Sequence, residues 1–184
     1  YKRADLVFSD IRRLVEIGKG KVQFIFSGKA HPHDEPGKDI LQKINNIARE
    51  LGTELPVVFI ENYNMGPAKF ITSGVDVWLN TPIRPREASG TSGMKCVHNG
   101  IMNFSVLDGW WIEGCIEGKT GWAIGPEPTE NGMVEYNEAE DAVDLYNKLE
   151  ENIIPTYYTD RKRWISMMKF AIAVNASYFN THRV

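Results

Sequence analysis

The chain has 184 residues, of which 42% are hydrophobic and 24% are charged, and its formal net charge is −3. This length and composition are ordinary for one soluble domain that buries a real core. The slight acidity gives no reason to expect a nucleic-acid or anionic-membrane partner, and no apolar run approaches the ~20 residues of a membrane-spanning helix. Cys96 and Cys115 lack metal-ligand spacing, so free thiols in a cytoplasmic protein are favoured over a disulfide.

Helical and strand patterns alternate along the first half of the chain. Apolar residues between Tyr1 and Ile17 recur at helical spacing, and the glycines that follow would end this helix. Short apolar runs predict buried parallel strands, and an amphipathic stripe predicts a long helix between two of them. The predicted elements are helices at 1–17, 36–51 and 66–73, and strands at 22–26, 55–60 and 75–80.

The second half continues in the same way. An amphipathic segment from Met94 to Phe104 predicts a helix, short strands are predicted at 105–107 and 122–124, and the Gly/Pro/Glu-rich stretch at 114–135 predicts a mobile loop or hairpin. Two helices, at 137–153 and 160–179, end the chain. The alternation predicts an α/β fold with a doubly wound parallel sheet, which binds ligands at the carboxyl ends of its strands.

The stretch Arg84-Pro-Arg-Glu-Ala-Ser-Gly-Thr-Ser-Gly-Met-Lys95 has the features of an anion-binding loop. It lies between a predicted strand and a helix start, where free N–H groups and the helix dipole favour an anion. Gly90 and Gly93 allow close approach of the backbone to a ligand, and Lys95 adds a positive charge. Hydroxyl donors come from Ser89, Thr91 and Ser92.

Glu87 is the carboxylate of this loop, and it suits binding of hydroxyl groups better than binding of phosphate. The loop therefore offers an anion site beside a site for a sugar-type ligand. The alternative is a set of ordinary cap residues and turn glycines, which explains the lysine and the glutamate less well. Lys29, in the loop after the first strand, could meet an anion or be a surface lysine, and His31 and His33 lack the partners of a zinc site.

The segment Glu87-Ala-Ser-Gly-Thr-Ser-Gly-Met-Lys95, with Asn99-Gly100 and Leu107-Asp-Gly109 after it, resembles the cofactor-binding signature of the α-glucan (glycogen/maltodextrin) phosphorylases. Further matching segments occur in family order across nearly the whole chain. They are Tyr1-Lys-Arg3, Gly28-Lys-Ala30 with Pro32, Phe59-Ile-Glu-Asn-Tyr63, the pair Trp110-Trp111, and Phe179-Asn-Thr-His-Arg183, of which the last two resemble the bacterial and archaeal short forms.

The resemblance implies a Rossmann-like C-terminal half of a two-lobed GT-B type glycosyltransferase, with pyridoxal 5'-phosphate held covalently by Lys95. It places Lys2 near the cofactor phosphate, and Asn64 stands where mammalian members carry a basic residue. Glu87 and Lys95 join Lys2 as the implied catalytic residues. The implied cofactor-binding residues are Lys95, Gly90, Thr91, Ser92, Tyr63, Asn64 and Met65, and the implied substrate-binding residues are Glu87, Ser89 and Gly90.

The implied reaction cleaves terminal α-1,4-glucosidic bonds of glycogen, starch or maltodextrin with inorganic phosphate and yields glucose 1-phosphate. The cofactor phosphate and the substrate phosphate must then lie close together, which requires cations and N–H dipoles around them. Family members have a strand and a phosphate-contacting arginine before this stretch. We therefore expect the chain to be a fragment that needs the N-terminal lobe of the same protein, with a homo-oligomer as a further possibility and with no nucleic-acid or membrane partner.

Three other functions remain open. A nucleotide-sugar-dependent retaining glucan synthase would carry a second glutamate eight positions after Glu87, but Lys95 stands there and cannot accept hydrogen bonds from a ribose. The isolated chain could instead bind cofactor or phosphate weakly without catalysis. An aminotransferase is the most distant alternative, because those enzymes place the cofactor lysine in an unrelated sequence setting.

Overall fold

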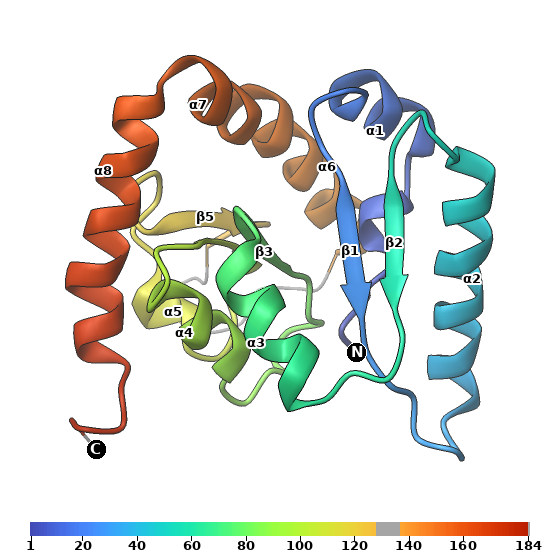
Figure 1. Ribbon diagram of the computed structural model, residues 1–184, viewed down its shortest axis with the longest axis horizontal. Helices are drawn as coiled ribbons and strands as arrows, with labels where there is room; N and C mark the ends of the chain where they lie inside the picture. The colour runs from blue at the N-terminus through green and yellow to red at the C-terminus, as the bar shows by residue number, and fades with distance from the viewer. Residues whose placement is uncertain (128–136, 184) are drawn as a thin grey trace. The chain divides into compact units, whose positions relative to one another are not determined.

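Two parallel sheets organise the computed structural model, which describes residues 1–127 and 137–183 (Figure 1). The chain divides into two units, and each is described by itself. The small unit is Ala4–Lys69, and the large unit is Tyr1–Arg3 with Phe70–Val184. The expected α/β class with parallel strands is confirmed, and the strands form one sheet in each unit. The organisation as one domain stays a prediction.

The small unit places two parallel strands beside a long helix. Phe24 lies beside Val57 in the register of β1 and β2. Two helix starts follow from acidic caps, because Asp10 and Asp34 each accept a hydrogen bond from a first-turn N–H group. The elements are η1 (Leu6–Phe8), α1 (Ile11–Gly18), β1 (Phe24–Ser27), α2 (Glu35–Leu51), β2 (Val57–Ile60) and the start of α3 (Met65–Gly74).

The core of the small unit is aromatic. The ring of Phe8 lies 6.2 Å from that of Phe24 and 5.6 Å from that of Phe26. The expectation that the first strands are buried on both faces is wrong within this unit, because Ile25 is 41% exposed and Val58 is 51% exposed. These neighbours share one face of the sheet, and the phenylalanines use the other face.

The large unit contains three parallel strands in the order β3-β4-β5. The middle strand β4 is buried along its whole length, as a strand with neighbours on both edges and helices on its faces should be. The elements are β3 (Val77–Asn80), α4 (Thr91–Val97), β4 (Met102–Val106), α5 (Trp111–Gly114), β5 (Gly121–Ile124), α6 (Glu138–Lys148), a π-helix (Leu149–Ile153), α7 (Ile154–Thr159), α8 (Arg161–Ala171) and a second π-helix (Ile172–Ala176).

Two predicted helices have wrong boundaries. The helix predicted at 1–17 is only η1 and α1, because Arg3 has a φ of 44° and Tyr1–Arg3 lies along another segment. The helix predicted from Met94 to Phe104 ends at Val97, because Gly100, with a φ of 74°, closes its last turn. The residues from 102 onward form β4, so the strand predicted at 105–107 begins three residues earlier.

The two C-terminal helices were predicted correctly in position and differ in detail. The helix predicted at 137–153 becomes α6 and a π-helical turn, and the one predicted at 160–179 becomes α8 and a second π-helical turn. The predicted loop or hairpin at 114–135 contains β5, and its residues 128–135 lie outside the described part of the chain. In the described part, no helix has the length and apolar character needed to span a membrane.

Candidate functional site

The segment between β3 and α4, residues 81–90, is called the signature loop, and it has the predicted strand-loop-helix arrangement. It leaves β3 at Asn80 and reaches α4 at Thr91, with Gly90 as the helix N-cap at a φ of 91°. A left-handed N-cap favours glycine, and the first N–H groups of the helix have no partners within it. Lys95 lies in the last turn of α4 and its side chain is exposed. The amine that the family resemblance assigns to a cofactor is therefore accessible.

Lys2 and Glu87 form an ion pair across the large unit, with Lys2 Nζ donating to Glu87 Oε2. The Lys2 side chain is 50% exposed, while that of Glu87 is 7% exposed. Because Glu87 is buried, its carboxylate needs such a partner. The structure thus brings together two of the three residues predicted to be catalytic, although they are 85 positions apart in the chain.

A turn at Asp108–Trp110 is hydrogen-bonded to the backbone of the signature loop. Asp108 Oδ2 accepts a hydrogen bond of 2.8 Å from the Glu87 N–H, and Ser89 O accepts one of 2.8 Å from the Trp110 N–H. Gly109 has a φ of 55°, and a Cβ there would lie only 3.0 Å from Glu87 O. Asp108 has a structural role that the sequence does not predict, although Asp108 belongs to the matching segment Leu107-Asp-Gly109.

Trp110 and Asn103 fix the start of α4. A Cβ on Gly93 would lie 2.9 Å from Trp110 Nε1 and would collide with Asn103 Oδ1. Asn103 Nδ2 also donates a hydrogen bond of 3.2 Å to Gly93 O, and the Trp110 ring packs at 5.0 Å against that of Phe179. Packing against Trp110 and Asn103 therefore requires a glycine at position 93, independently of any ligand.

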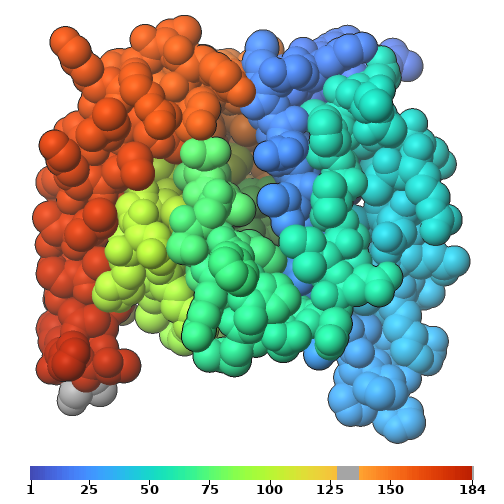
Figure 2. Space-filling model, in the orientation of Figure 1, coloured from blue at the N-terminus to red at the C-terminus, as the bar shows by residue number. Residues whose placement is uncertain are grey.

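The other predicted cofactor-binding residues belong to the small unit. Asn64 is engaged locally, since its Oδ1 accepts from the Gly66 N–H at 2.9 Å and its Nδ2 donates to Asn62 O at 2.8 Å. Met65 is 74% exposed and begins helix α3, which is green on the visible surface in Figure 2. Tyr63 is half-buried. Their contact with a cofactor stays a prediction, as does a role for the exposed Lys29.

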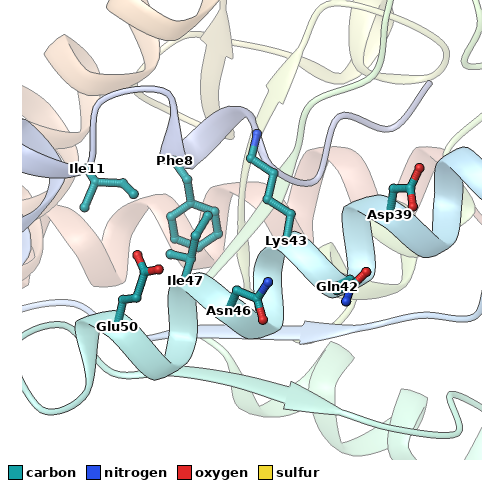
Figure 3. Close-up of a pocket in the computed structure, with 8 residues that line it drawn as sticks. All are labelled: Phe8, Ile11, Asp39, Gln42, Lys43, Asn46, Ile47 and Glu50. Atoms are coloured by element: carbon teal, nitrogen blue, oxygen red, sulfur yellow. The ribbon is translucent and has the colours of Figure 1, made fainter.

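A hollow of about 450 Å³ lies beside α2 in the small unit (Figure 3). Phe8, Ile11 and Ile47 give it an apolar side, and polar side chains of α2 surround the rest. No residue of the predicted site lines it. Its lining residues are Phe8, Ile11, Asp39, Gln42, Lys43, Asn46, Ile47 and Glu50. The position of the chemical groups, and not this hollow, therefore identifies the candidate site.

The cysteines are free thiols, and both are held in the neutral form. Burial raises the pKa of Cys96 to about 12, against a smaller lowering by Lys95, and burial with the neighbouring Glu117 raises the pKa of Cys115 to about 12. Cys96 is 0% exposed, so it packs inward while Lys95 faces solvent. The two neighbours therefore lie on different sides of α4.

We predict that iodoacetamide alkylates both cysteines slowly in the native protein at pH 8. A thiol with a pKa of about 12 is a thiolate in about 10⁻⁴ of molecules at this pH, against about a quarter for a free cysteine. Mass spectrometry of native and urea-unfolded protein measures the two rates. Native alkylation at Cys115 as fast as in urea would contradict the prediction.

The chain is similar to known proteins along its whole length. Residues 6–123 match the family model Phosphorylase, described as carbohydrate phosphorylase. The chain is 50% identical to the maltodextrin phosphorylase of Thermococcus litoralis over 187 aligned positions, which cover 100% of this chain and 22% of that protein. It is 46% identical to the glycogen phosphorylase of Aquifex aeolicus, covering 100% of this chain and 27% of that protein, and 36% identical to that of Mycobacterium tuberculosis, covering 94% and 21%.

Among solved structures, Anabaena HepE in complex with UDP and glucose superposes with a TM-score of 0.72 at 17% identity. The match covers 100% of this chain and 42% of that chain. At this identity the likeness shows the fold alone, and it agrees with the fold class expected from the sequence. The chain spans about a quarter of the length of the phosphorylases it matches.

Proposed function

The chain belongs to the carbohydrate phosphorylase family, and from this membership we propose that it is the cofactor-binding part of an α-glucan phosphorylase. The proposed enzyme cleaves terminal α-1,4-glucosidic bonds of glycogen or maltodextrin with inorganic phosphate and releases glucose 1-phosphate. The observation that supports the proposal is the arrangement in the large unit, where Lys2 pairs with Glu87 of the loop that leads to the glycine-capped start of α4.

The residues present fit pyridoxal phosphate. Lys95 offers an exposed primary amine, and Gly90 gives the loop before it a backbone without a side chain. Lys2 offers a half-exposed cation for a phosphate group. Lys95 would hold the cofactor covalently, and Gly90, Thr91 and Ser92 would lie along it. When bound, pyridoxal phosphate supplies a phosphate group that exchanges a proton with the substrate phosphate.

In the proposed reaction the cation of Lys2 would act on the phosphate groups, and the carboxylate of Glu87 would act on the sugar. Lys2 offsets the repulsion between two phosphate groups, which in a site of low dielectric costs several kcal/mol without a cation. Glu87 accepts hydrogen bonds from glucosyl hydroxyls, and Ser89 and Gly90 lie beside it in the same loop. The buried Asp108 keeps the Glu87 backbone in place, so the carboxylate approaches the sugar from a fixed direction.

A nucleotide-sugar-dependent glucan synthase is the second candidate function. A protein solved with UDP and glucose shares the fold, and at 17% identity this likeness favours the synthase only as far as a common fold can. Against it, the position eight residues after Glu87 is Lys95, an exposed cation that cannot accept hydrogen bonds from ribose hydroxyls. The same lysine suits covalent attachment of an aldehyde cofactor. We therefore favour the phosphorylase.

Phosphate-dependent release of glucose 1-phosphate from maltodextrin tests the proposal directly. We expect release by the intact protein when inorganic phosphate and pyridoxal phosphate are present, and no release by the 184-residue chain alone. The matched control replaces phosphate by sulfate. Binding of UDP-glucose or ADP-glucose, with glucan extension and no phosphorolysis by the intact protein, would overturn the proposal in favour of the synthase.

A further inference from the structure

Tyr1–Arg3 forms a short strap bound to the segment Thr81–Ile83 that follows β3. The Ile83 N–H donates to Tyr1 O at 2.8 Å. The hydroxyl of Thr81 lies 2.9 Å from both Lys2 O and Arg3 O, and these two carbonyls share its single proton. The backbone on each side of Lys2 is therefore fixed to the loop that leads into the signature.

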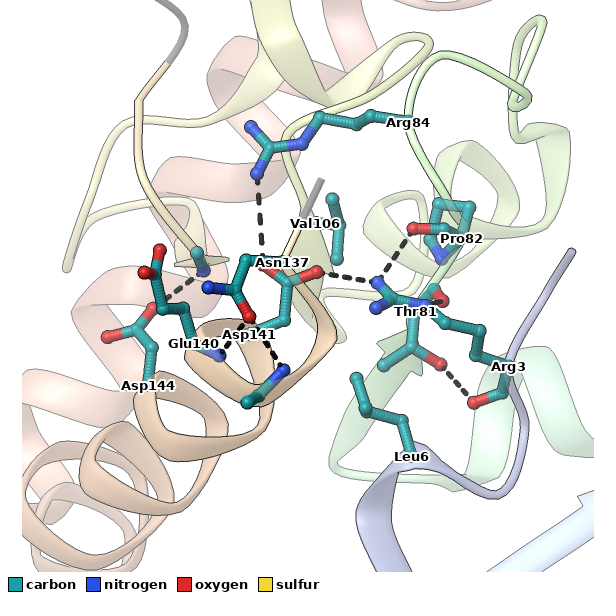
Figure 4. A network of polar contacts seen from close by, with 12 residues as sticks. Arg3, Leu6, Thr81, Pro82, Arg84, Val106, Asn137, Glu140, Asp141 and Asp144 are labelled. Carbon is teal, nitrogen blue, oxygen red and sulfur yellow. Dashed lines mark hydrogen bonds and ion pairs between the residues drawn. The ribbon is translucent and has the colours of Figure 1, made fainter. Parts of the chain in front are cut away.

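Arg3 ties the strap to the start of α6 (Figure 4). Its Nε donates to Thr81 O at 2.9 Å, and its Nη2 donates to Pro82 O at 2.9 Å and to Asp141 Oδ2 at 2.7 Å. Arg3 is 6% exposed and Asp141 is 2% exposed, so this pair lies inside the large unit. Arg84 Nη2, 3.8 Å from Asp141 Oδ1, adds a second cation to the same carboxylate.

This strap determines where the Lys2 cation lies. A half-exposed lysine loses much side-chain entropy when it is held at one place, and a mobile backbone would make that cost larger. Here Tyr1 O accepts from the Ile83 N–H, and Lys2 O and Arg3 O share the Thr81 hydroxyl. Arg3 adopts a φ of 44° to fit the strap. The Lys2 side chain then reaches Glu87 from a backbone that is already ordered.

We propose that Thr81, Arg3 and Asp141 are positioning residues that hold the Lys2 cation at the phosphate-binding part of the site. The inference rests on the proposed function and extends it to residues that touch neither sugar nor phosphate. Arg3 and Asp141 are buried, so their replacement risks a general loss of stability. Thr81 offers the sharper test, because valine has the same shape and lacks only the hydroxyl that the strap uses.

The test is a double-mutant cycle on the intact enzyme with the variants Thr81→Val, Lys2→Met and their combination. We expect Thr81→Val to raise the KM for phosphate about 2- to 10-fold, as the loss of one hydrogen bond does, with a smaller change in kcat. Thr81→Ser, which keeps the hydroxyl, should restore the KM. In the Lys2→Met background, Thr81→Val should change the KM no further, because its effect passes through Lys2. Equal effects in both backgrounds would overturn the inference.

Amide hydrogen exchange at Ile83 gives a readout independent of activity, since this N–H donates to Tyr1 O. Thr81→Val should speed that exchange, and Glu54→Gln should leave both the exchange and the KM unchanged, because it removes only the exposed Lys19–Glu54 pair of 2.6 Å. Faster exchange with an unchanged phosphate KM would overturn the positioning role and leave the phosphorylase proposal standing. Wild-type enzyme without phosphorolysis would overturn both.

Discussion

Replacing Lys95 by arginine is expected to abolish covalent attachment of pyridoxal phosphate. Arginine keeps the positive charge at the end of α4, but its guanidinium does not form a stable link to an aldehyde at neutral pH. Activity of the intact enzyme should fall on the order of 10²- to 10⁴-fold, the usual contribution of general acid–base catalysis, because the cofactor phosphate that exchanges the proton is no longer anchored. Borohydride treatment with pyridoxal phosphate, followed by peptide mass spectrometry, should find the pyridoxyl group at Lys95 in the wild type and at no residue in the variant.

Lys29→Arg is the matched control. Lys29 is also an exposed lysine in a loop after a parallel strand, and the sequence leaves open whether it meets an anion. This variant should retain labelling at Lys95. If labelling persists in Lys95→Arg and disappears in Lys29→Arg, the cofactor is attached to Lys29, and the assignment to Lys95 is wrong. No labelling of the wild type, together with UDP-glucose binding, would contradict the cofactor assignment altogether.

The sequence predicts the local layout of the site well because that layout depends on short-range chemistry. Gly90 is found at a left-handed helix N-cap, and the loop lies at the carboxyl end of β3, as the order of apolar runs and glycines indicates. Cys96 and Lys95 face opposite environments because neighbours on a helix diverge by about 100°. These features need no knowledge of distant contacts.

The sequence fails where a distant segment determines the local structure. Tyr1–Arg3 has helical spacing with the residues after it, but hydrogen bonds to Thr81–Ile83 hold it in another conformation. The apolar residues before Phe104 fit a helix or a strand equally, and pairing with β3 decides for a strand. Asp108 gives no signal of its own, since its role is to accept the N–H of Glu87, 21 positions earlier.

Gly93→Ala is expected to destabilise the protein by about 1–3 kcal/mol, as overpacking of a filled core does. The new Cβ would lie 2.9 Å from Trp110 Nε1 and would collide with Asn103 Oδ1. Trp110 is 5% exposed and Asn103 is 1% exposed, so neither side chain can turn toward solvent. Moving Asn103 would also break its hydrogen bond of 3.2 Å to Gly93 O and leave a buried amide without a partner. Urea unfolding of the intact protein, followed by tryptophan fluorescence, measures the change in unfolding free energy.

The sign of the change in unfolding free energy shows whether packing or helix propensity dominates at position 93. Alanine normally stabilises a helix relative to glycine by about 1 kcal/mol, so a site without close neighbours should respond in the opposite direction. Gly74→Ala is the matched control, because Gly74 ends helix α3 and a Cβ there would meet no atom within 4 Å. We expect it to be neutral or to stabilise by about 0.4–1 kcal/mol. If Gly93→Ala also stabilises, Trp110 and Asn103 do not confine the start of α4, and these two side chains do not hold the helix that carries Lys95.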